Sequence, residues 1–107
     1  MKLKSTKEVN EQVLRVLGIY KRLTRRELVQ LTNLSDRQVR LAIAELRDEG
    51  HMVGITANGG YSLNIPEDFS RAIANYKARA REEERRIRIM ERTLEEHQLT
   101  GQISWSF

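Results

Sequence analysis

Residues 23–54 read LTRRELVQLTNLSDRQVRLAIAELRDEGHMVG and contain the clearest structural signals in the chain. Thr24 is followed three residues later by Glu27, and Ser35 by Gln38, a spacing typical of the capping box that begins a helix. Apolar residues at helical spacing follow each box, namely Leu28 and Leu31 after the first and Val39, Ala42, Ile43 and Leu46 after the second. We therefore predict a short helix, a tight turn at residues 32–34, and a longer helix over residues 35–49.

Similar signals flank this stretch on both sides. Ser5 and Glu8 form a possible third capping box, and the apolar residues that follow predict a helix ending near residues 18–20. Downstream, residues 52–56 and 60–64 read as two short strands around Ala57-Asn58-Gly59. Because Asn-Gly is a strong hairpin signal, we expect a type I′ turn here. Residues 1–65 are thus predicted to form three helices and a β-hairpin.

This order of elements is typical of a winged helix-turn-helix domain, and the stretch 23–54 resembles that family directly. The resemblance covers roughly residues 9–65 and includes bacterial and phage regulators of the biotin-repressor and multiple-antibiotic-resistance types. It implies that Leu28 and Leu31 hold the second helix, that Leu34 fills the turn, and that Ser35 caps the recognition helix. It also implies binding of double-stranded DNA.

Helical geometry indicates which side chains would meet DNA. The face of the third helix opposite Val39 and Ile43 carries residues that can read bases, because arginine binds guanine and small apolar groups contact the thymine methyl. These base-reading candidates are Arg37, Arg40, Leu41, Ala44 and Arg47, of which Arg40 and Arg47 lie on one flank beside Asp36. The candidates for phosphate contacts are Lys21, Arg22, Arg25, Arg26 and Ser35. Lys2, Lys4 and Lys7 form a possible basic arm.

The predicted wing contains no lysine or arginine, since residues 51–65 lack both. Two alternatives follow for its tip. Either it contacts the DNA backbone through Asn58 and the amides of Gly59 and Gly60, or it does not bind DNA.

The chain from Pro66 to about residue 98 contains no further proline and no glycine, which predicts one long helix of about 33 residues. Its apolar residues recur with heptad spacing. The predicted dimer seam contains Ile73, Tyr76, Ala80, Glu83, Ile87, Met90 and Leu94. In a parallel pair Arg79 and Arg86 would face Glu84 and Glu91 of the second copy, so the charges favour a parallel homodimer. The alternative is a single helix supported by internal Glu82–Arg86 and Glu84–Arg88 pairs.

Composition narrows the range of functions. The net charge is +4, and all of this excess lies in residues 1–65, while residues 66–107 are balanced. There is no cysteine, and the two histidines lie far apart, so we expect no metal and no cofactor. No nucleophile–base pair or phosphate-binding loop is recognisable, and an enzyme is not expected. No signal peptide or membrane span is predicted, which favours a cytoplasmic, nucleoid-associated protein.

The sequence thus predicts a mainly α protein with three parts: a winged helix-turn-helix domain at 1–65, a long C-terminal helix at 66–98 that forms a dimerisation coiled coil, and a tail at 99–107. The leading hypothesis is a homodimeric bacterial or phage transcriptional regulator that binds specific double-stranded DNA, with no small-molecule substrate evident. The alternative is a non-enzymatic adaptor in a replication or phage assembly complex. The uncharged wing and the tail residues Trp105 and Phe107 favour the adaptor.

Overall fold

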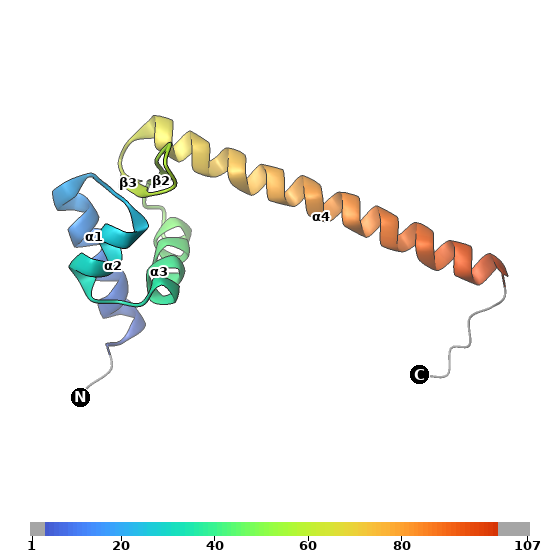
Figure 1. The fold of residues 1–107 in the computed structure, drawn as a ribbon, viewed down its shortest axis with the longest axis horizontal. Helices are drawn as coiled ribbons and strands as arrows, with labels where there is room; N and C mark the ends of the chain where they lie inside the picture. The colour runs from blue at the N-terminus through green and yellow to red at the C-terminus, as the bar shows by residue number, and fades with distance from the viewer. Residues whose placement is uncertain (1–3, 101–107) are drawn as a thin grey trace. The chain divides into compact units, whose positions relative to one another are not determined.

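The computed structural model describes residues 4–100 and is mainly helical, with a small three-stranded antiparallel sheet and a long C-terminal helix (Figure 1). The chain divides into two compact units, of which the first ends at Ile73 and the second begins at Ala74. The predicted boundary at residue 65 is therefore too early, because the first two turns of the long helix belong to the first unit. The tail residues Trp105 and Phe107, and Lys2 of the predicted basic arm, lie outside the described residues.

Three helices form most of the first unit: α1 (Thr6–Tyr20), α2 (Arg25–Thr32) and α3 (Asp36–Asp48). Thr24 and Ser35 begin α2 and α3 with reciprocal capping boxes, as predicted. At α1 the Ser5 hydroxyl accepts the amide of Glu8 at 3.2 Å, which is half of such a box. These local hydrogen bonds satisfy amides that a helix start leaves unpaired, so the helix starts are readable from sequence.

The core lies between these helices and the sheet. The predicted core face of α3, formed by Val39, Ala42, Ile43 and Leu46, is fully buried. Leu34 fills the turn between α2 and α3 as expected, with 6% of its surface exposed. Leu31, however, is 45% exposed and does not hold α2, whereas Leu28 is fully buried and Val29 packs against the core beside it. The expectation that Leu31 holds α2 is therefore wrong.

The sheet contains one strand more than predicted. Strand β1 (Arg22–Leu23) joins β2 (Val53–Ile55) and β3 (Tyr61–Leu63) in the order β1-β3-β2, with Leu23 opposite Tyr61. Two residues are too short to show strand periodicity, and the strand exists only because β3 pairs with it. Lys21 precedes it at φ 70°, a left-handed conformation that turns the chain sharply from α1 into β1.

The hairpin turn between β2 and β3 differs from the predicted type I′. A type I′ turn needs positive φ at both central residues, but within this turn only Gly59 has it, at 86°. The Gly59 amide donates to the Thr56 carbonyl, and the Thr56 amide donates to the Gly60 carbonyl, both at 3.0 Å. This pattern is typical of a three-residue loop that ends in a left-handed glycine.

Helix α4 (Pro66–Thr100) begins against the sheet. Asp68, only 2% exposed, lies 3.2 Å from Arg22 Nε of β1 and accepts a hydrogen bond from Arg71 Nη1 at 3.0 Å. Arg71 also donates to the Ile55 carbonyl of β2 at 2.8 Å. Gly54 allows this approach, since a Cβ there would lie 2.5 Å from the Asp68 carbonyl carbon. These contacts explain why the first unit extends past Pro66.

Replacing Asp68 by asparagine is expected to lower the thermal unfolding midpoint by roughly 5–10 °C at pH 7, because Arg22 and Arg71 lose a buried carboxylate. The Ser62 hydroxyl and both guanidinium groups hold the pKa of Asp68 below its ordinary value of 3.8. Its stabilising contribution is thus complete above that value and is lost as pH falls through the lower folded-state pKa. The difference between wild type and variant should therefore shrink in acid.

Circular dichroism melts between pH 2 and pH 7 measure this difference. Glu67→Gln is the matched control. The carboxylate of Glu67 neighbours Asp68 in the chain, but it is 78% exposed and lies 4.0 Å from Arg71. Equal midpoints for Asp68→Asn and wild type at pH 7 would contradict the role assigned to Asp68.

Candidate nucleic-acid interface

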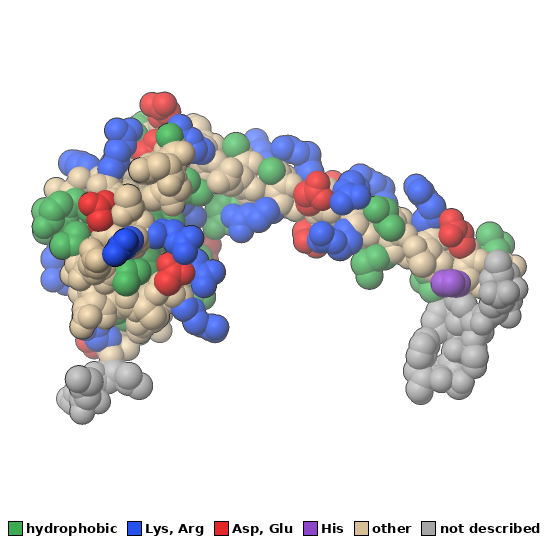
Figure 2. All heavy atoms as spheres, in the orientation of Figure 1, with side chains coloured by type: hydrophobic (Ala, Val, Ile, Leu, Met, Phe, Trp, Pro, Cys, Tyr) green, Lys and Arg blue, Asp and Glu red, His purple; other side chains and the backbone are tan. Residues whose placement is uncertain are grey.

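Helix α3 presents a polar, arginine-bearing face opposite its buried one. Arg37 and Leu41 are exposed, the latter at 53%, and Ala44 is half-buried beside them. Arg37 makes no ion pair or hydrogen bond with any other described residue, so its guanidinium is available to a ligand. Figure 2 shows Lys and Arg side chains gathered over and beside the helices of this unit.

A single carboxylate links two of the predicted arginines. Arg25 of α2 donates from Nε to Asp36 Oδ1 at 3.1 Å and from Nη2 to Oδ2 at 3.3 Å. Arg40 Nε lies 3.0 Å from the same Oδ2, one helical turn along α3. We call Arg25, Asp36 and Arg40 the bridged cluster. It carries a formal charge of one positive unit, and all three side chains are 40–60% exposed.

Tyr61 of β3 lies close to this cluster. Burial raises the pKa of its hydroxyl above the ordinary value, while the nearby Arg25 and Arg47 act in the opposite direction. Tyr61 carries no signal in the sequence that points to this position, because its place depends on the pairing of β3 with β1. The hairpin residue near the bridged cluster is therefore a buried tyrosine and not a lysine or arginine.

The predicted phosphate-binding residues separate into three groups. Lys21 and Arg26 are exposed and make no described ion pair or hydrogen bond through their side chains. Arg25 is held by Asp36, and Arg22 lies at 3.2 Å from Asp68. Ser35 is occupied by capping, since its hydroxyl accepts the Gln38 amide at 3.1 Å and its own amide donates to the Gln38 side chain at 2.9 Å. Lys21 and Arg26 therefore remain as the phosphate candidates.

Arg47 does not join the base-reading face. Its Nε donates to the Val53 carbonyl of β2 at 2.8 Å, and the side chain is half-buried. The helical projection alone could not reveal this contact, because it depends on where the chain returns after α3. This hydrogen bond of Arg47 therefore joins α3 to strand β2 of the hairpin.

The predicted hairpin tip offers little to a ligand. The amides of Gly59 and Gly60 both donate to Thr56, the first to its carbonyl and the second to its hydroxyl at 2.8 Å. Gly60 is buried, and a Cβ there would lie 2.3 Å from the Leu23 carbonyl oxygen, so it supports packing on β1. The Asn58 side chain accepts from the Thr56 hydroxyl but stays exposed. The amides of Gly59 and Gly60 are thus already used within the turn, and Asn58 is the tip residue whose side chain stays exposed.

The predicted seam of α4 is exposed along its described length. The exposed fractions are 42% for Ile73, 46% for Tyr76, 53% for Ile87, 63% for Met90 and 44% for Leu94, and Ala80 and Glu83 are exposed as well. Glu83, the acidic residue within the seam, is paired with Arg86 of its own helix at 2.7 Å.

Internal pairs of α4 differ from those predicted. Glu82 pairs with Arg85 at 3.1 Å, and Glu83 with Arg86, so the spacing is three residues and not four. Arg79 lies over the Tyr76 ring at 4.6 Å from its centroid. Arg79 and Arg86 therefore lie against seam residues of their own helix.

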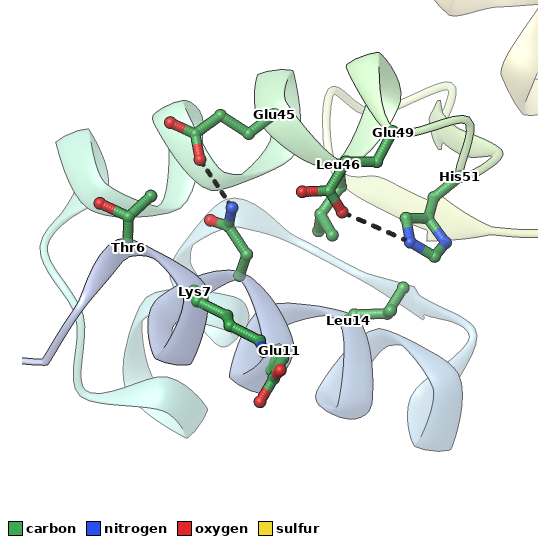
Figure 3. A pocket seen from close by; sticks show the side chains of 9 residues that line it. Thr6, Lys7, Glu11, Leu14, Glu45, Leu46, Glu49 and His51 are labelled. Carbon is green, nitrogen blue, oxygen red and sulfur yellow. Dashed lines mark hydrogen bonds and ion pairs between the residues drawn. The ribbon is translucent and has the colours of Figure 1, made fainter.

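A hollow with no signal in the sequence lies between α1 and the end of α3 (Figure 3). Its volume is about 550 Å³, and its ionisable lining consists of Lys7, Glu11, Glu45, Glu49 and His51. Glu45 accepts from the buried Asn10 side chain at 2.6 Å, and His51 Nε2 lies 3.8 Å from Glu49. Because three carboxylates line it, this hollow is not part of the positively charged surface proposed to meet DNA.

Over residues 4–100, no cluster of three potential metal ligands is present. None of the described helices combines the length and apolar character that a membrane span requires. Comparison with protein-family models, with curated proteins and with solved structures found no match to this chain.

Proposed function

We propose that the first unit is a winged helix-turn-helix domain that binds double-stranded DNA through α3. The element order supports this proposal: a helix, a short strand, two helices joined by a tight turn, and a hairpin whose strands complete an antiparallel sheet with β1. In such domains the second helix of the helix-turn-helix enters the major groove. Fold alone does not establish function, so the exposed side chains carry the proposal.

The observation that carries it is the exposed face of α3. Arg37 and Arg40 extend from consecutive turns, and Leu41, one turn after Arg37 on the same face, is an apolar residue left 53% exposed. Arginine can donate two hydrogen bonds to one guanine, and an aliphatic group can contact a thymine methyl. The half-buried Ala44 lets the helix approach base edges closely. Lys21 and Arg26 then contact phosphates of the DNA backbone.

The second part of the proposal is a homodimer formed through α4. The stripe of Ile73, Ile87, Met90 and Leu94 repeats at heptad spacing and is exposed in the single chain. A second copy would bury it, and the pairing of Glu83 with Arg86 reduces the cost of placing a carboxylate in the seam. Two copies would then meet half-sites about 34 Å apart, or a multiple of that distance. A bacterial or phage transcriptional regulator is the role that we propose.

A protein-interaction adaptor is the second candidate, and the hairpin favours it. Residues 51–65 contain no lysine or arginine, and the amides of Gly59 and Gly60 are already used within the turn. A wing without cationic side chains contributes little to DNA affinity, so such a domain could bind a protein instead. The two candidates differ in whether the chain binds random duplex DNA at low salt.

Binding to a random-sequence duplex at several salt concentrations tests the proposal. Two phosphate contacts per copy, from Lys21 and Arg26, predict that the logarithm of the binding constant falls with the logarithm of salt with a slope of about −1.8 per copy. We expect micromolar affinity at low salt, measured by fluorescence anisotropy. Absence of binding at the lowest salt would overturn the DNA-binding proposal in favour of the adaptor.

A further inference from the structure

Asp36 is an acidic residue at the first position of the helix proposed to enter the major groove, where the phosphate groups of DNA would repel it. Its carboxylate nevertheless bridges two elements, with Arg25 of α2 on one side and Arg40 of α3 on the other. Both arginine side chains remain more than half exposed, at 54% and 60%. The bridge therefore lies at the surface, where it faces solvent.

The two arginines are held differently. Arg25 uses both Nε and Nη2 on the carboxylate, in the two-point geometry that guanidinium groups also use on phosphate. Arg40 forms an ion pair with the same carboxylate, with Nε 3.0 Å from Oδ2, but donates no hydrogen bond to any described residue, so both of its Nη groups are unused. Those two groups form the pair of donors that a guanine edge accepts.

We propose that Asp36 sets the DNA specificity of this domain by occupying Arg25 and orienting Arg40. By occupying Arg25, the carboxylate removes one cation from sequence-independent phosphate binding. By forming an ion pair with Arg40, it keeps that guanidinium beside the start of α3 with its Nη groups unused, which reduces the conformational freedom lost when they bind a base edge. Asp36 is thus a positioning residue, and the inference rests on the proposed function.

The test compares Asp36→Asn with Asp48→Asn, on random duplex and on a site selected from random duplexes. Asp48 is the matched control, because it lies on the same helix, is exposed, and has no ion pair or hydrogen bond of its side chain among the described residues. Asp36→Asn is expected to bind random duplex about 3–10-fold more tightly at low salt. Its salt slope should steepen by about 0.9 per copy, because Arg25 becomes a phosphate contact. The ratio of specific to random affinity should fall about tenfold, whereas Asp48→Asn should keep the wild-type slope and ratio.

The double variant Arg25→Gln/Asp36→Asn separates the two effects. Its salt slope should return to the wild-type value, because Arg25 is no longer present to contact a phosphate. Its ratio of specific to random affinity should stay reduced. Asp36→Glu, which keeps the negative charge, should restore most of the wild-type ratio. Thermal unfolding of each variant establishes that it is folded.

If wild type binds DNA and Asp36→Asn behaves like Asp48→Asn in both slope and ratio, the role of Asp36 is overturned while DNA binding stands. If neither wild type nor Asp36→Asn binds random duplex at the lowest salt, the proposed function itself is wrong, and this inference falls with it. The two failures are therefore distinguishable.

Discussion

Replacing Arg40 by alanine is expected to weaken binding to the selected DNA site by roughly 5- to 150-fold, since a two-point arginine–guanine contact contributes about 1–3 kcal/mol. Arg40 is 60% exposed on α3, and its only described ion pair is with Asp36. Its removal leaves the core face of Val39 and Ile43 intact, so the fold should be retained. Affinity for random duplex should change much less, which identifies Arg40 as a base-reading residue.

Arg15→Ala is the matched control for this experiment. Arg15 is an exposed arginine of α1 in the same unit, and its removal changes the net charge by the same amount. Arg37→Ala should resemble Arg40→Ala in the size of its effect. If Arg37→Ala and Arg40→Ala both keep wild-type affinity for the selected site, the proposed base-reading face of α3 is wrong. A protein partner that binds Arg40→Ala unchanged, while DNA binding is lost, would separate an adaptor surface from the DNA surface.

Replacing Ile87 by aspartate is expected to raise the dissociation constant of the proposed homodimer at least ~100-fold, because the substitution places two carboxylates at one layer of the seam. Ile87 is 53% exposed in the single chain, so the substitution removes no contact that stabilises the first unit. Sedimentation equilibrium measures the change directly. DNA affinity should fall with it, since two linked units bind two half-sites more tightly than one.

The chain supplies an unusually close control for Ile87. Ile89 lies two residues further along α4, is 45% exposed, and falls outside the heptad stripe. Ile89→Asp should leave the dimer intact. Equal weakening by both substitutions would show that the heptad seam is not the interface.

Single cysteines determine the orientation of the pair, because the chain has no cysteine of its own. Ala80 and Leu94 are 14 residues apart, about 21 Å along the helix. In a parallel, in-register pair, the Ala80→Cys variant and the Leu94→Cys variant each form a disulfide between two copies of the same variant. In an antiparallel pair centred between them, a disulfide forms only when the two variants are mixed. We expect the parallel result, because Arg79 and Arg86 then face Glu84 and Glu91 of the second copy.

The helices of this protein were largely predictable from sequence because the interactions that begin them are local. Thr24 and Ser35 find their capping partners three residues away, and the buried face of α3 follows from a spacing that one helix imposes. The length of α4 was predicted to within two residues at its C-terminal end, because no proline or glycine interrupts it. The identities of the exposed residues on α3 followed from the same geometry.

Contacts between distant segments were not predictable in this way. Strand β1 exists because Leu23 pairs with Tyr61, which lies far along the chain. The unit boundary at Ile73 depends on Asp68 meeting Arg22 and Arg71, and the loss of Arg47 from the basic face depends on the Val53 carbonyl. Each of these interactions requires two segments to be brought together by the fold.

The sequence by itself therefore determined where helices begin, which faces they bury and which arginines stay outside the core, because those properties depend on residues within one or two turns. Only the tertiary structure decided which of those arginines remain available to bind a ligand. Arg25 and Arg40 share Asp36, Arg22 pairs with Asp68, and Arg37 pairs with no residue in the part of the chain that the structure describes. The physical reason is that a guanidinium binds whichever carboxylate or carbonyl the fold places within about 3 Å, however far away it lies in the chain.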